Sequence, residues 1–208
     1  TDAWIQLNEH NGNSYLLGAV DEISSYHYNI EWLDGSYKME AITQKNFYTG
    51  NTPGSIAGEG AVMFMVSKQQ EDALLKVDDI HTWHQTDSTV PVSALHTFLG
   101  KNGLSVSDID VLVSGENGDN RLTAYYLSVE NIFPEETVVL RFKHICGEYA
   151  TAASIALYFC CSINKHQVLP SGLVKKRGTG NTFRKMLIYN NYKGYQHSFM
   201  LVSDPRIS

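Results

Sequence analysis

Gly58-Glu59-Gly60-Ala61-Val62-Met63-Phe64-Met65-Val66 is the stretch that decides the fold. Its first half is a pair of glycines around one carboxylate, and its second half is an apolar run bounded by the polar Ser67-Lys68. A short apolar run rich in β-forming residues and closed by turn residues predicts a strand. The stretch therefore reads as a tight glycine turn that opens directly into a strand.

Similar runs recur along the rest of the chain. Most are continuous rather than alternating, which is typical of strands buried on both faces. Segments with helical spacing lie between them, and strands that alternate with helices predict stacked α/β layers. We expect strands at 15–20, 61–66, 109–113, 137–142, 185–189 and 198–202, helices at 93–99, 120–132 and 147–163, and loops at 21–53 and 167–181.

Length and charge narrow the class of protein. The chain has 208 residues, enough for one domain or one and a half. Its 16 Lys and Arg against 22 Asp and Glu give a net charge of −6, which argues against a nucleic-acid binder. The one basic run, Lys175-Lys176-Arg177, is interpreted as a solvated loop. The longest apolar stretch, 152–162, falls short of the ~18 residues of a membrane helix, so no membrane association is expected.

The cysteines indicate the compartment. The chain has three, Cys146, Cys160 and Cys161, which cannot all pair. The polar opening Thr1-Asp2 has no signal-peptide pattern. We therefore expect reduced thiols and a cytoplasmic protein. The absence of an initiating Met favours processing or a longer parent chain.

Several landmarks follow one another in a characteristic order. They are Leu17–Glu22 at a strand end, the Gly58–Ala61 turn, the segment Asn102–Val111, Lys143 with Gly147 at the head of an Ala-rich helix, and Ile188–Val202 around Gly194. Together they resemble the β-ketoacyl synthases of fatty-acid and polyketide assembly. The resemblance implies a thiolase-like layered α-β-α fold, represented by the closing hairpin of the first half and the second half. Residues 1–66 would be the tail of the N-terminal half, beginning with a helix end at Thr1–His10, and residues 67–208 the C-terminal half.

The catalytic positions implied by the resemblance depart from the family pattern. The nucleophilic Cys of the family lies upstream of the Tyr15 strand, and this sequence contains no counterpart. A His expected near Gly115 is absent, and Glu148 stands where the second His should follow Gly147. Lys143 is retained in a supporting role and could pair with Glu148. The Gly-rich turn near the acyl pocket keeps only Gly194.

Two functional hypotheses follow from this pattern. The first is a catalytically degenerate β-ketoacyl synthase-like protein, inactive on its own, that serves as a partner or scaffold in acyl-chain condensation. The alternative is the C-terminal portion of an active 3-oxoacyl-[acyl-carrier-protein] synthase, an acyltransferase whose Cys lies in an upstream segment or partner chain. We expect a homo- or hetero-oligomer with a ketosynthase-like chain, acyl carrier protein as a further candidate partner, and no cofactor or metal.

Individual residues admit rival interpretations. Cys146 is a candidate nucleophile because it lies at a strand–helix junction, where a helix N-terminus can lower the pKa of a thiol, although Glu148 opposes this. The same Cys146 also fits a small packing residue. His81 and His84 have a metal-ligand spacing, but no further ligands complete a site nearby. Glu59 fits a carboxylate that accepts backbone N–H groups.

The predicted loop 21–53 is unusually rich in aromatic residues. Tyr and Trp are enriched at protein interfaces, so this cluster fits a partner surface as well as a packed loop. Its members are Tyr26, Tyr28, Trp32, Tyr37, Phe47 and Tyr48.

Overall fold

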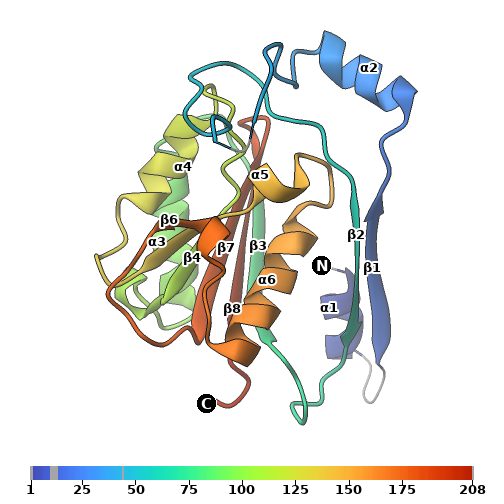
Figure 1. Cartoon of the computed structure of the whole chain (residues 1–208). Coiled ribbons are helices and arrows are strands. Elements are labelled where there is room, and N and C mark those ends of the chain that lie inside the picture. The colour runs from blue at the N-terminus through green and yellow to red at the C-terminus, as the bar shows by residue number, and fades with distance from the viewer. Residues whose placement is uncertain (1, 10–13, 44, 208) are drawn as a thin grey trace.

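The computed structural model describes residues 2–9, 14–43 and 45–207. Its main body is a six-stranded mixed sheet in the order β3-β8-β7-β4-β5-β6 (Figure 1). The central strand β4 is parallel to both of its neighbours, β5 and β7, and the remaining pairs are antiparallel. The strands are β3 (Lys76–His84), β4 (Val111–Ser114), β5 (Val138–Arg141), β6 (Val174–Lys176), β7 (Lys185–Tyr192) and β8 (Gln196–Ser203).

Helices cover both faces of this sheet, as Figure 1 shows. On one face, α3 (Val90–Lys101) and α4 (Thr123–Glu130) pack through Leu95 and Val129 onto Leu112 of β4. On the other face, α6 (Ala153–His166) packs through Ala156 onto Val113. Successive side chains of a strand point to opposite faces, so Val111, Leu112 and Val113 of β4 must all be apolar. The continuous apolar run expected at 109–113 is thereby confirmed as a strand, β4, that is buried on both sides.

A second, smaller sheet stands on the far side of α6 (Figure 1). Strands β1 (Tyr15–Asp21) and β2 (Gly60–Val66) pair antiparallel, and α6 lies against β2. Phe64 and its alternate neighbours on β2 are partly buried, whereas Met63 and Met65 are exposed. The layers of the described residues thus run from α3 and α4 through the large sheet and α6 to the small sheet.

Helix α2 (Ser25–Leu33) corrects the expected loop at 21–53. Its first turn is capped because the Ser24 hydroxyl accepts the His27 backbone N–H at 3.2 Å, a standard N-cap contact. None of its residues is fully buried. The sequence does not reveal this helix, because its aromatic residues also occur in loops and do not form a clear amphipathic pattern.

Other boundaries also differ from the expectation. Strand β3 is missed because it carries polar residues and a bulge between Val77 and Asp79, which hide both the apolar run and the alternation. The expected 147–163 helix begins only at Ala153, as α6. A separate short helix, α5 (Lys143–Cys146), precedes it and ends at Gly147, which has φ of 76°. β6 lies within the expected 167–181 loop. Helix α1 (Asp2–Glu9) lies within the expected 1–10 helix end, of which Thr1 and His10 are outside the described residues.

The His197 ring is the centre of a buried polar network beneath α4. Its Nε2 lies 2.9 Å from the Gln85 carbonyl, which can only accept, so Nε2 carries the proton. Its Nδ1 then accepts from Asn191 Nδ2 at 3.0 Å and from the Tyr189 hydroxyl at 3.1 Å. The Trp83 ring stacks on the imidazole at 4.9 Å. Burial, with a smaller contribution from His84, lowers the pKa of His197.

We expect the free energy of unfolding to fall as the pH drops below about 6.5, the ordinary pKa of His. The folded state keeps His197 neutral, so the unfolded chain binds more protons in this range and is favoured. Burial likewise lowers the pKa of His144, which adds to the effect. Urea unfolding at a series of pH values from neutral downward measures the slope. His197→Gln should flatten it, and an unchanged slope in that variant would contradict the assignment.

Candidate functional site

The Lys143–Glu148 ion pair is the core of the candidate site. Lys143 is the first residue of α5, and its side chain is 0% exposed. Its ammonium donates to both carboxylate oxygens of Glu148, at 2.8 Å to Oε1 and 2.6 Å to Oε2. The ion pair expected from the sequence is therefore present, and it is the charge partner that the buried ammonium requires.

Asn117 joins this pair from the loop after β4. Its Nδ2 donates to Glu148 Oε2 at 2.8 Å, and its Oδ1 accepts the Asp119 backbone N–H at 3.2 Å. The neighbouring Glu116 turns away and binds Lys175 at 2.6 Å. Sequence reasoning missed Asn117. The available signal was an amide directly after a buried strand and just before a glycine.

Gly115, the position singled out from the sequence, contributes packing. Its backbone N–H donates to the Tyr189 carbonyl at 2.8 Å. A Cβ added there would lie 2.2 Å from Asn190 Oδ1. Within the described residues the structure thus brings Asn117, rather than Gly115, to Lys143 and Glu148.

Two glycines in contact set the position of Glu148. A Cβ on Gly58 would lie 2.0 Å from the Cys146 carbonyl oxygen, and one on Gly147 would lie 2.5 Å from the Gly58 Cα. The close approach allows the Glu148 N–H to donate to the Ile56 carbonyl at 2.8 Å, in a parallel bridge between Ala57 and Glu148. The glycine turn before β2 therefore holds the loop that presents Glu148.

Cys146 occupies the last position of α5 rather than the start of a helix. The helix dipole there disfavours a thiolate, in contrast to the N-terminal position expected from the sequence. Burial raises its pKa to about 11. His144 does not serve it as a base, because its Nδ1 lies 3.1 Å from the Tyr48 hydroxyl and its Nε2 lies 2.9 Å from the Gly172 carbonyl. This environment favours the packing interpretation of Cys146.

A pocket of about 650 Å³ opens above the ion pair. Glu148 and Asn117 form part of its wall, and Gly194 lines it from the turn between β7 and β8. Gly194 has φ of 78° and donates its N–H to Asn191 Oδ1 at 2.8 Å. The structure thus places Glu148 and Gly194, far apart in sequence, on one cavity.

The remaining candidates from the sequence, Glu59, His81 and His84, make contacts typical of structural residues. Glu59 Oε2 accepts the Ile23 N–H at 3.1 Å, which supports the backbone-binding interpretation, although the donor comes from beyond β1. His81 stacks on Trp83, while His84 stacks on Tyr195. In the described part of the chain, no group of three His, Cys, Asp or Glu side chains is arranged to hold a metal ion.

The aromatic cluster divides into two parts. Tyr28 stacks on Trp32 and on Tyr37 at the base of α2. Phe47 is fully buried, and Tyr48 lies under the Arg141 guanidinium at 3.6 Å. Among these residues, Tyr26 is the most exposed, at 72%. Phe47 and Tyr48 therefore pack against the body of the protein, whereas the exposed Tyr26 lies on α2.

Comparison with known proteins identifies the fold. No family model matches the sequence, and no curated protein matches it. Solved structures do match. The ketosynthase from module 6 of the bacillaene synthase of Bacillus subtilis aligns with a TM-score of 0.74 at 12% identity, over 96% of this chain and 44% of that chain.

Two further structures agree. A type II polyketide synthase acyl-carrier protein in complex with its ketosynthase gives a TM-score of 0.73 at 13% identity, over 97% of this chain and 59% of that one. The ishigamide ketosynthase/chain length factor gives 0.68 at 13% identity, over 91% and 53%. The protein therefore has the thiolase-like fold of the ketosynthases, as the sequence resemblance implied. It spans about half the length of these chains.

No helix among the described residues has both the length and the hydrophobicity needed to cross a membrane.

We expect Glu148→Gln to lower the free energy of unfolding by about 3 kcal/mol, because it leaves the Lys143 ammonium buried without a counter-charge. Adding Lys143→Met should recover part of the loss. Urea unfolding of the two single variants and the double variant measures the coupling. The control is Asp78→Asn, which breaks the pair with Lys76; the Lys76 side chain is 59% exposed, so water solvates the freed ammonium and stability should change by no more than about 0.5 kcal/mol. Equal losses in Glu148→Gln and the control would contradict the role of the ion pair.

Proposed function

We propose that the protein is a ketosynthase-like component of acyl-chain condensation that is inactive on its own and serves as a partner or scaffold subunit. The supporting likeness is to ketosynthase structures of polyketide assembly. In this proposal residues 1–66 are the tail of an N-terminal half and residues 67–208 form the C-terminal half. The positions that match the family site are Gly115, Lys143, Glu148 and Gly194.

The observation that carries the proposal is that Glu148 accepts the hydrogen bonds of both Lys143 and Asn117. Loss of carbon dioxide from a malonyl thioester breaks a C–C bond and leaves an enolate, which needs hydrogen-bond donors. Lys143 Nζ and Asn117 Nδ2 both donate to the Glu148 carboxylate. An ionised carboxylate cannot donate, and its charge repels the enolate. The site as built therefore disfavours the reaction.

A nucleophile with a suitable environment is likewise absent from the described residues. Condensation by the thioester route needs an activated thiolate. Burial raises the pKa of Cys146 to about 11 and raises that of the fully buried Cys160 further. Cys161 has a raised pKa for the same reason. These thiols support packing roles.

The small sheet supports a role as a subunit. The outer face of β1–β2 is entirely apolar: Leu16 pairs with Met65, Gly18 with Met63 and Val20 with Ala61. Met65 is 73% exposed and Leu16 is 68% exposed. An apolar face of this kind is costly in water and marks a surface that another polypeptide covers. We propose that a ketosynthase-like chain or a second copy covers it, with acyl carrier protein as a further partner.

The alternative is that this chain is the C-terminal portion of an active 3-oxoacyl-[acyl-carrier-protein] synthase. It is supported by the chain's coverage of about half of the matched ketosynthases. It requires a Cys at a helix start in an upstream segment or a partner chain. The intact mass of the natural polypeptide separates the two views, because a mass well above 23.3 kDa supports the alternative.

The isolated chain should give no condensation product and no carbon dioxide from malonyl-acyl carrier protein. The reason is that Glu148 occupies both donors and no activated thiolate is present in the described structure. Product mass spectrometry and carbon dioxide release measure the outcome, with an active ketosynthase as the positive control. Turnover above the protein-free blank would contradict the proposal.

Size-exclusion chromatography should show the purified chain as an oligomer or a mixture that shifts with concentration. Met63→Lys together with Met65→Lys should shift it toward the monomer, because charges on an exposed sheet oppose association. Leu74→Lys is the matched control, since Leu74 is 49% exposed but lies outside the small sheet. A stable monomer of the unmodified chain at all concentrations tested would contradict the prediction.

A further inference from the structure

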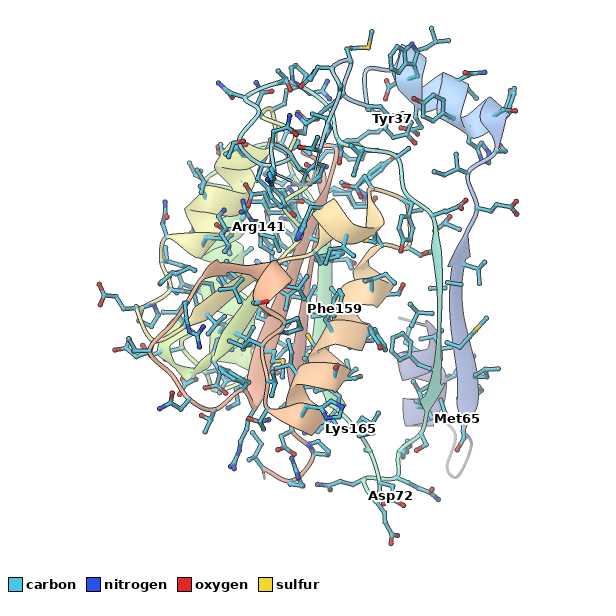
Figure 2. All side chains as sticks on the ribbon, viewed as in Figure 1. Tyr37, Met65, Asp72, Arg141, Phe159 and Lys165 are labelled. Carbon is cyan, nitrogen blue, oxygen red and sulfur yellow. The ribbon has the colours of Figure 1, made fainter. Side chains whose placement is uncertain are left out.

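The walls of the 650 Å³ pocket are rich in tyrosine. Of the 12 tyrosines in the chain, five line this cavity. They come from four regions: the segment after α2, helix α4, the loop at Glu148, and the β7–β8 turn around Gly194. Figure 2 shows Tyr37 at the end of the molecule that carries α2. The five are Tyr37, Tyr125, Tyr149, Tyr192 and Tyr195.

The charges on the lining are strongly unequal. Six carboxylates face two permanent cations, Arg121 and Lys193. The cations are already engaged, since Arg121 binds Asp119 at 2.6 Å and Lys193 binds two residues of the α2 region. Glu148 is neutralised from below by Lys143. The six carboxylates are Asp21, Glu22, Glu31, Asp34, Asp119 and Glu148.

Among the residues that line the pocket, neither cation is paired with Asp21 or Glu22. Asp21 Oδ2 accepts from the Thr151 backbone N–H at 2.9 Å and from its hydroxyl, both neutral groups. Glu22 is exposed, and within residues 2–9, 14–43 and 45–207 it has no ion pair. Burial, with the nearby charge of Asp21, raises the pKa of Tyr149 to about 12, so the phenol beside these carboxylates stays neutral. One wall of the pocket thus combines uncompensated negative charge with an aromatic ring.

The opposite wall already holds an ammonium group. Lys193 Nζ lies 2.6 Å from Asp34 Oδ2 and 3.1 Å from Glu31 Oε2, and 5.5 Å from the centre of the Tyr192 ring. Carboxylates and the face of an aromatic ring are the groups that bind ammonium ions. This chain therefore builds ammonium recognition into the same lining, independently of Asp21 and Glu22.

We propose that this pocket binds a small organic cation, an ammonium group with an apolar body. The ammonium would be placed at Asp21 and Glu22, and the body would lie against the tyrosine rings. The volume lies within the range of about 300–1,000 Å³ that small-molecule sites occupy. The same charges repel anions such as malonyl groups. This binding function goes beyond the proposed subunit role and does not depend on it.

Isothermal titration of the full chain at low salt tests the charge preference with three probes of one shape. Phenethylamine is the cation, phenethyl alcohol the neutral probe and phenylpropanoate the anion. We expect the amine to bind at least about tenfold more tightly than the alcohol, and the anion to show no binding. Added salt should weaken the binding of the amine, because it screens the charges. Binding of the anion equal to the amine, or no binding of the amine, would overturn the proposal.

Variants locate the site. Glu22→Gln should weaken amine binding about fivefold, the effect of one charge at contact distance in a solvated site. Asp21→Asn combined with Glu22→Gln should weaken it further. Glu71→Gln with Asp72→Asn is the matched control, an adjacent exposed acidic pair at the opposite end of the molecule, where Figure 2 labels Asp72. Equal weakening by the control would overturn the site.

Because Glu22 is exposed and unpaired in the described structure, Glu22→Gln leaves the fold intact and its result is interpretable. The condensation assay measures turnover, which is independent of amine binding. Absence of amine binding with zero turnover would defeat only the pocket proposal, whereas amine binding together with turnover would defeat only the subunit proposal.

Discussion

A lysine ammonium that water cannot reach must find its counter-charge inside the protein. Lys143 is such a group, and Glu148 supplies both of its acceptor oxygens. That contact requires the chain after α5 to pass directly against the turn before β2, where Gly58 and Gly147 leave no room for a Cβ. This glycine contact, with the bond from the Glu148 N–H to the Ile56 carbonyl, joins the segment leading into the small sheet to the loop beside the large one. The ion pair also fixes the chemistry of the pocket floor, because the donors that would stabilise an oxyanion are occupied.

The two sheets differ in how many of their faces are covered by helices. The large sheet has a helix layer on each face, so its central strand is apolar on both sides and fully buried. The small sheet has α6 on one side, and its outer face carries Leu16, Val20, Met63 and Met65 in contact with solvent. Apolar surface of this continuity is costly in water, which is the physical basis of the proposed partner.

The pocket beside Glu148 carries an excess of negative charge. Its lining is dominated by carboxylates and phenols, and its own cations are held in ion pairs. A cavity of this kind favours a positive ligand over an anionic thioester, since Coulomb interactions in a partly enclosed site are several times stronger than in bulk water. The proposed lack of condensation chemistry rests on Glu148 and its donors, whereas the proposed cation recognition rests on Asp21 and Glu22 of the same cavity.

The sequence alone determined the α/β class, the order of most strands, and the pairing of Lys143 with Glu148, because apolar runs and short-range spacing report burial and local contact. It also carried the resemblance to ketosynthases through ordered glycine landmarks such as Gly58–Ala61. It did not reveal β3, whose polar residues and bulge obscure its pattern, or α2, whose aromatic composition resembles a loop. It placed Cys146 at the start of a helix, whereas the positive φ of Gly147 makes it the end of one. Only the tertiary structure brought Asn117 to Glu148 and gathered Asp21, Tyr149 and Lys193 around one cavity, because those contacts join residues far apart in the chain and no local pattern encodes them.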